Sequence, residues 1–173
     1  MKLSDDPFTQ SEVEVINIPE GVQGIKDTLR CMGRLIQQGK RSMQVRDKAL
    51  SLIKHLPPKA YRKEVEALHQ YVRDSMRYCQ DTTDIEVVQT ADASLRIMQG
   101  DCDDKAVLLC SLLESIGHKT RLVAIGFSPG IYEHVLLDTL IGPYWVSCEA
   151  TEDVDIGWEP QSGTIKCKLL YYN

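Results

Sequence analysis

Apolar residues recur at helical spacing along three stretches in the first half of the chain, residues 22–39, 45–56 and 61–76. In each stretch the apolar side chains fall on one face of a helix, as they do in a helix that packs one side against a core. The first pattern ends near Gly39, the second at the Pro57-Pro58 pair, and the third near Cys79. We therefore predict three amphipathic core helices.

A further helix is predicted near the centre of the chain. Residues 81–99 are polar and irregular, with a short helical pattern over 91–98. Residues 102–116 follow, apolar on nearly every side, and Gly117 closes them as a C-terminal glycine cap. A helix of this kind has to be surrounded by protein, so we expect it to be central.

After Gly117 the apolar pattern changes to a period of two, which indicates strands. The predicted strands cover residues 120–127, 134–139, 144–151 and 165–171, with turns at 128–130 and 140–143, and residues 11–18 are a candidate edge strand. Strands joined by such short turns run antiparallel. Helices, then a central helix, then an antiparallel sheet predict an α+β fold.

Length, charge and the absence of long apolar runs limit the classes of protein to which this chain can belong. At 173 residues the chain fits one domain. Its net charge of −5 and its pI near 5.4 disfavour nucleic acid or an anionic membrane as the main partner, because both select basic surfaces. The start, MKLSDDPFTQ, has no apolar signal segment, and no apolar run approaches the roughly 20 residues that span a bilayer. The six cysteines include no CxxC pair, so we expect reduced thiols and a cytoplasmic protein.

The stretch GDCDDKAVLLC, residues 100–110, carries the first candidate chemistry. Asp101 is a favourable N-cap and Asp104 imitates the second member of a capping box, which places Cys102 at the first helical position. There the helix dipole lowers the pKa of a thiol, whereas the neighbouring carboxylates of Asp101, Asp103 and Asp104 raise it. A reactive Cys102 thiolate therefore needs a cationic partner.

His134 is the candidate partner, since it stands alone in the apolar strand EHVLLD. A hairpin centred on Ile141-Gly142 would set His134 directly opposite Glu149, whose carboxylate can orient an imidazole. A cysteine at a helix start with a histidine and a carboxylate on adjacent strands suits nucleophilic thiol catalysis. The backbone N–H of Cys102, with the side chain of Gln89 or Gln99, is the candidate oxyanion donor.

The run from YVRDSMRYCQD through GDCDDKAVLLC and EHVLL to YWVSCEAT resembles the transglutaminase-like superfamily of papain-type thiol enzymes. It is most similar to the short form found in bacteriophages and prophages, over about residues 65–151. The resemblance implies a papain/transglutaminase-like core in which Cys102 is the nucleophile, His134 the general base and Glu149 the orienting acid. The family usually has aspartate where this chain has Glu149. We expect one domain over residues 1–173, with residues 1–60 as an N-terminal helical extension and residues 61–173 as the catalytic core.

Three hypotheses follow. The first is a thiol enzyme without cofactor that acts on an amide bond of a protein or peptide through a thioester, as a peptidase, amidase or transglutaminase. The second is a non-enzymatic morphogenesis or interaction protein of a phage, with phage structural proteins as partners, in the host cytoplasm or on the virion. The third, a metal site of Cys102, Asp103, Asp104 and His134, is disfavoured because no second thiol or histidine lies at zinc-ligand spacing.

Two more residues are candidates for substrate binding. Asp103 could bind a cationic substrate, although capping and the surface are the simpler explanation for both Asp103 and Asp104. Trp145 shares the strand face of Glu149 by parity and could shield the site from water.

Overall fold

The computed structural model describes residues 13–16, 21–80, 86–161 and 163–172, with backbone alone for residues 13–16 and 86. Within these residues it has five helices, and all five fall where the apolar pattern predicts them. They are α1 (Val22–Gly39), α2 (Met43–Ile53), α3 (Tyr61–Ser75), α4 (Ala91–Ile97) and α5 (Cys102–Ser115).

The strands form one main sheet and two small pairs in the described part of the chain. The main sheet has the order β7-β6-β5-β8 and is antiparallel throughout. Its strands are β5 (Thr120–Gly126), β6 (His134–Ile141), β7 (Tyr144–Cys148) and β8 (Cys167–Tyr172). The small pairs are β1 (Val13–Ile16) with β3 (Glu86–Gln89), and β2 (Arg77–Tyr78) with β4 (Gln99–Gly100). The predicted α+β fold is confirmed.

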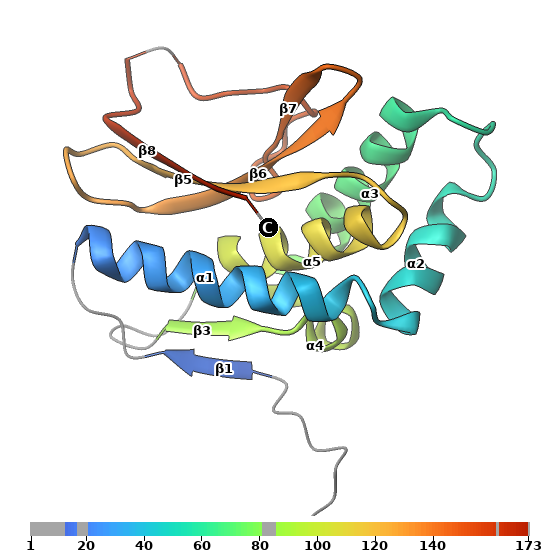
Figure 1. The fold of residues 1–173 in the computed structure, drawn as a ribbon, viewed down its shortest axis with the longest axis horizontal. Helices are drawn as coiled ribbons and strands as arrows, with labels where there is room; N and C mark the ends of the chain where they lie inside the picture. The colour runs from blue at the N-terminus through green and yellow to red at the C-terminus, as the bar shows by residue number, and fades with distance from the viewer. Residues whose placement is uncertain (1–12, 17–20, 81–85, 162, 173) are drawn as a thin grey trace, which may run out of the picture.

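Helix α5 is the centre of the molecule, as its sequence predicts. Every side chain from Asp103 to Leu113 is buried. The helix contacts the other four helices and strands β5 and β6, so the main sheet covers one side of it while α1 and α3 flank it (Figure 1). A side chain at the first turn of α5 is therefore held between the sheet and the helices.

The β6–β7 hairpin corrects one prediction. Its two-residue turn is Gly142-Pro143, so Ile141 faces Tyr144 and Leu137 faces Cys148. Gly142 adopts the positive φ of 60° that the turn needs, and Pro143 has no N–H to give to the ladder. The predicted centre at Ile141-Gly142 was wrong by one residue, which moves every cross-strand partner by two. His134 is therefore not directly opposite Glu149, and β7 ends before Glu149 is reached.

None of the helices that the structure describes is long and apolar enough to cross a membrane.

Candidate active site

Cys102 occupies the first position of α5, under the predicted cap. One carboxylate oxygen of Asp101 accepts hydrogen bonds from the N–H groups of Asp103 at 3.0 Å and Asp104 at 3.3 Å. The Asp104 carboxylate in turn accepts from the Asp101 N–H at 3.4 Å, which completes the capping box. The cap takes the second and third N–H groups of the helix and leaves that of Cys102 outside it.

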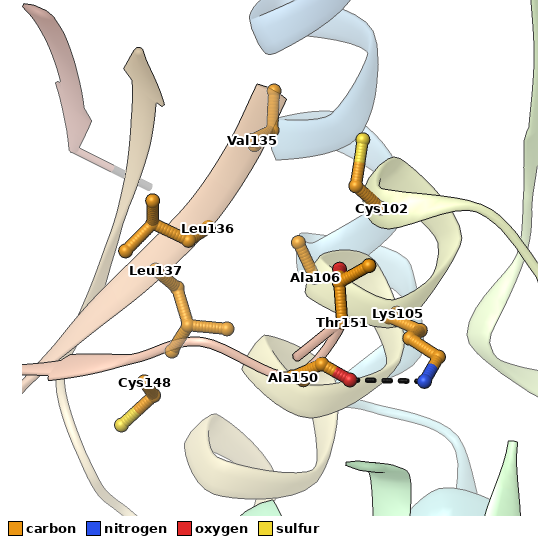
Figure 2. A pocket seen from close by; sticks show the side chains of 9 residues that line it. All are labelled: Cys102, Lys105, Ala106, Val135, Leu136, Leu137, Cys148, Ala150 and Thr151. Atoms are coloured by element: carbon orange, nitrogen blue, oxygen red, sulfur yellow. Dashed lines mark hydrogen bonds between the residues drawn. The ribbon is translucent and has the colours of Figure 1, made fainter. Parts of the chain in front are cut away.

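The Cys102 thiol lies in a narrow pocket between α5 and the main sheet. The pocket is lined by side chains from α5, from β6 and from the segment around the end of β7, among them Cys102, Val135 and Thr151 (Figure 2). The thiol Sγ is 3.5 Å from the Asp103 Oδ1, to which it can donate its proton. Burial raises the pKa of this thiol, and the negative charges of Asp103 and Asp101 raise it further, whereas the backbone N–H of Val135 lowers it. The Cys102 thiol is thus neutral at rest.

Asp103 and Asp104 are not surface groups, contrary to the sequence-based expectation. Their exposed fractions are 4% and 1%. The Asp104 carboxylate accepts hydrogen bonds from the backbone N–H of Gln89 at 2.7 Å and from its side-chain amide at 2.8 Å. Burial nevertheless raises the pKa of Asp104 to about 7.

His134 and Glu149 form a hydrogen-bonded pair. The Nε2 of His134 lies 2.6 Å from the Oε2 of Glu149, a carboxylate that is 2% exposed. The other carboxylate oxygen accepts a hydrogen bond from the Thr151 N–H at 2.6 Å. Burial alone would raise the pKa of Glu149, but the bonds from His134 and Thr151 outweigh it and lower the pKa. An ionised Glu149 holds the His134 proton on Nε2 and leaves Nδ1 as the basic nitrogen.

His134 lies at the start of β6, next in the chain to a residue that contacts the thiol. It immediately precedes Val135, the residue whose backbone N–H acts on the Cys102 sulfur. The start of β6 thus lies at the first turn of α5. The segments that carry the three residues predicted as nucleophile, base and acid meet at one end of α5.

The chain matches the sequence profile of the Transglutaminase-like superfamily over residues 50–150. It belongs to this superfamily. The matched segment spans α3 to the end of β7 and includes Cys102, His134 and Glu149.

Solved structures agree on the fold of this transglutaminase-like protein. A "putative protease" from Parabacteroides distasonis superposes with a TM-score of 0.57 at 15% identity, over 72% of this chain and 26% of that one. A "putative cysteine protease" from Cytophaga hutchinsonii gives a TM-score of 0.54 at 16% identity, over 93% of this chain and 58% of that one. The chain therefore spans about a quarter and somewhat over half of these two proteins. No curated protein gave a significant match.

Two buried cationic or imidazole groups of the site were missed by the sequence analysis. Lys105, one turn after Cys102 on α5, donates to the carbonyl oxygen of Ala150 at 2.9 Å (Figure 2). His69 of α3 donates from Nε2 to the carbonyl oxygen of Glu149. The sequence held one indication of the role of Lys105, which is a lysine directly before the apolar run of the central helix.

Gln89 and Trp145 have other partners than the thiol. The side-chain N–H groups of Gln89 point to Asp104 and to the carbonyl oxygen of Gln99, which lies 3.1 Å away. Trp145 lies near the other end of β7, where its ring covers the Arg121 guanidinium at 4.4 Å. Trp145 lies four positions before Glu149, which corresponds to about 13 Å along an extended chain. Among the described residues, no hydrogen bond joins either side chain to Cys102.

The residues that the structure describes contain no group of three or more histidine, cysteine or acidic side chains arranged to hold a metal ion.

Proposed function

We propose that this transglutaminase-like protein is a cysteine-dependent enzyme that acts on an amide bond of a protein or peptide through a thioester. The observation that carries the proposal is the His134–Glu149 pair, 2.6 Å apart and adjacent to the residue whose N–H acts on the Cys102 sulfur. A buried carboxylate bound to Nε2 makes Nδ1 of His134 a base within the site.

In the proposed reaction His134 accepts the Cys102 proton as the sulfur attacks the carbonyl carbon of the substrate. The tetrahedral intermediate places its oxyanion at the start of α5, where the N–H of Cys102 lies outside the cap. His134 then gives the proton to the departing amine as the C–N bond breaks. The acyl group stays on sulfur as a thioester, which water hydrolyses or a second amine accepts.

The neutral thiol decides how the reaction begins. Because burial, together with the Asp103 carboxylate, raises the pKa of Cys102, a preformed thiolate–imidazolium pair is disfavoured. Proton transfer to His134 therefore accompanies the attack on the substrate. Asp103 also places a negative charge beside the nucleophile, which would favour a cationic group near the amide that reacts.

Mass spectrometry tests the proposal by trapping. The protein is incubated with a peptide library, and a thioester on Cys102 is the expected product. C102A is the control, and it should give neither adduct nor cleaved or cross-linked peptide. Peptide products that are equal in the two proteins would show that Cys102 is not the nucleophile.

A second candidate function is a non-enzymatic phage morphogenesis protein that keeps the fold. The burial of Cys102 and its raised pKa are the specific observations in its favour. Stoichiometric iodoacetamide at pH 6–7 separates the two functions. Labelling of Cys102 that is faster in the wild type than in H134A supports the enzyme, and equally slow labelling of Cys102 in both proteins supports the structural protein.

A further inference from the structure

The main sheet does not hold Glu149. Strand β7 ends at Cys148, so no ladder hydrogen bond to β6 fixes the backbone of Glu149 or of the residues after it. An acid that orients a catalytic imidazole has to be held closely, since small misplacements in an active site cost large factors in rate. Something other than the sheet must therefore position this segment.

Three basic side chains bind the carbonyl oxygens of this segment. His69 donates to Glu149, Lys105 to Ala150 at 2.9 Å, and Arg73 to Val154 at 2.8 Å. His69 and Lys105 are 2% and 3% exposed. Burial lowers the pKa of His69, in keeping with a neutral imidazole whose single N–H is on Nε2.

Lys105 connects the acid to the nucleophile. It lies three residues after Cys102, one turn along the same helix, so it moves with the thiol as a rigid unit. Its ammonium group also donates to the carbonyl oxygen of Arg73 at 3.3 Å, in the last turn of α3, where helix carbonyls lack partners. One side chain thus joins α5, α3 and the segment after β7.

A buried lysine that donates to a carbonyl oxygen carries a large desolvation cost. Removing an ammonium group from water costs free energy that its hydrogen bonds only partly recover. Burial lowers the pKa of Lys105, while the charges of Glu149 and Asp74 raise it. A carbonyl of Ala150 could be satisfied by a neutral donor, so the choice of lysine points to a role beside Glu149.

We propose that Lys105, assisted by His69, is a positioning residue that fixes Glu149 and through it His134 relative to Cys102. This inference rests on the proposed function, because it concerns how the same triad is held. Neither residue touches the reacting atoms. Both act through the backbone of Glu149 and Ala150.

K105M tests the inference, because methionine keeps the length of the side chain and loses the donor. We expect the rate of Cys102 alkylation at neutral pH to fall about tenfold, as when a hydrogen bond to a charged group is lost. The pH–rate profile should shift towards that of E149Q, since His134 loses its fixed acid in both variants. K105R keeps the charge and the donors and should recover part of the rate.

A double-mutant cycle distinguishes positioning from a general loss of stability. If Lys105 acts through Glu149, the E149Q/K105M double variant should be little slower than E149Q alone. K40M is the matched control, because Lys40 forms a salt bridge to Glu114 at the far end of α5, with N and O 3.1 Å apart. It should lower the melting temperature without changing the pH profile. Additive effects of E149Q and K105M, or a K105M profile like that of K40M, would overturn the inference.

His69 gives an independent pair of variants. H69L removes the donor to Glu149, whereas H69Q keeps an N–H at a similar reach. We expect H69L to behave like K105M and H69Q like the wild type, and the opposite order would contradict the inference.

Apart from the substituted side chain itself, the charged groups around the site are the same in all these variants. The charged groups that act on Cys102 are Asp101 and Asp103 of the α5 cap, with Tyr78 of β2 and Glu152 beside them. Asp74 of α3 acts on Lys105, and Arg73 of α3 and Asp155 after β7 act on His69. A change in the pH profile between K105M and K105R therefore reports the link to Glu149. The alkylation rate of Cys102 in H134A separates a failure of the inference from a failure of the proposed function. If H134A alkylates Cys102 as fast as the wild type, it is the proposed function that fails.

Discussion

The Nε2 of His134 and the Oε2 of Glu149 lie 2.6 Å apart although the two residues do not face each other in the sheet. Continued by three residues, the β6–β7 register would set His134 opposite Thr151, so Glu149 is its diagonal neighbour. Diagonal neighbours are farther apart than directly opposed ones, with Cα atoms about 7–8 Å from one another. The side chain of glutamate is one methylene group longer than that of aspartate, and it covers this extra distance.

Shortening the acid is therefore expected to weaken the site. In E149D the carboxylate is one methylene group shorter and falls short of His134 while the segment after β7 stays held by Lys105. We expect alkylation of Cys102 at neutral pH to slow about tenfold, as on loss of a charged hydrogen bond. E149Q keeps the length, loses the charge, and serves as the reference. An E149D protein as reactive as the wild type would mean that the register does not require glutamate.

The five helices, β1 and the four strands of the main sheet could be predicted because each leaves a local period in the sequence. The short strands β2, β3 and β4 lie outside the predicted strands. The His134–Glu149 contact could also be predicted, although the register was wrong, because a shift of two residues keeps both side chains on the same strand face. The hairpin centre was misplaced because the pattern alone does not show that Gly142 and Pro143 together form the turn.

The contacts around the cap could not be predicted from the sequence. Gln89 reaches Asp104 across 15 positions of chain, and Lys105 reaches Ala150 across 45. Such contacts depend on how α5 packs against β3 and against the end of β7, which no local pattern encodes. Burial of Asp103 and Asp104 follows from the same packing, so these residues looked like surface groups in the sequence.

Asp103 is expected to suppress the reactivity of Cys102. Its carboxylate lies 3.5 Å from the thiol sulfur and accepts a hydrogen bond from the S–H group. After burial, its negative charge is the next cause that raises the thiol pKa. Replacing it in D103N removes the negative charge, so the pKa should fall by about one unit or more. At a fixed neutral pH a larger fraction is then thiolate, and alkylation should be faster than in the wild type. D47N, at an exposed site on α2, should leave the rate unchanged, and a D103N protein with wild-type kinetics would contradict this role.

Gly100 is expected to be needed for the cap to form. A Cβ atom at this position would lie 2.6 Å from the Cβ of Asp104 and 2.8 Å from the Cε of Met76. Asp104 is 1% exposed and its carboxylate is bound by the N–H groups of Asp101 and Gln89, so a shift of Asp104 would disturb these bonds. G100A should therefore lower the free energy of unfolding by about 1–3 kcal/mol, the usual cost of overpacking. Urea denaturation measures it, and an unchanged midpoint would show that the capping box can shift without cost.

Asp104 is expected to make the protein less stable as the pH rises from 4 to 7. Its pKa is raised to about 7 in the folded protein, mainly by burial, from an ordinary value of 3.8. Between these values the folded state keeps a proton that the unfolded state has released. The free energy of unfolding should then fall with rising pH, by at most about 1.4 kcal/mol per pH unit, and level off above pH 7. Urea denaturation of the wild type and of D104N at pH 5, 6, 7 and 8 isolates this contribution, since asparagine does not titrate. Parallel stability curves for the two proteins would show that Asp104 has an ordinary pKa when folded.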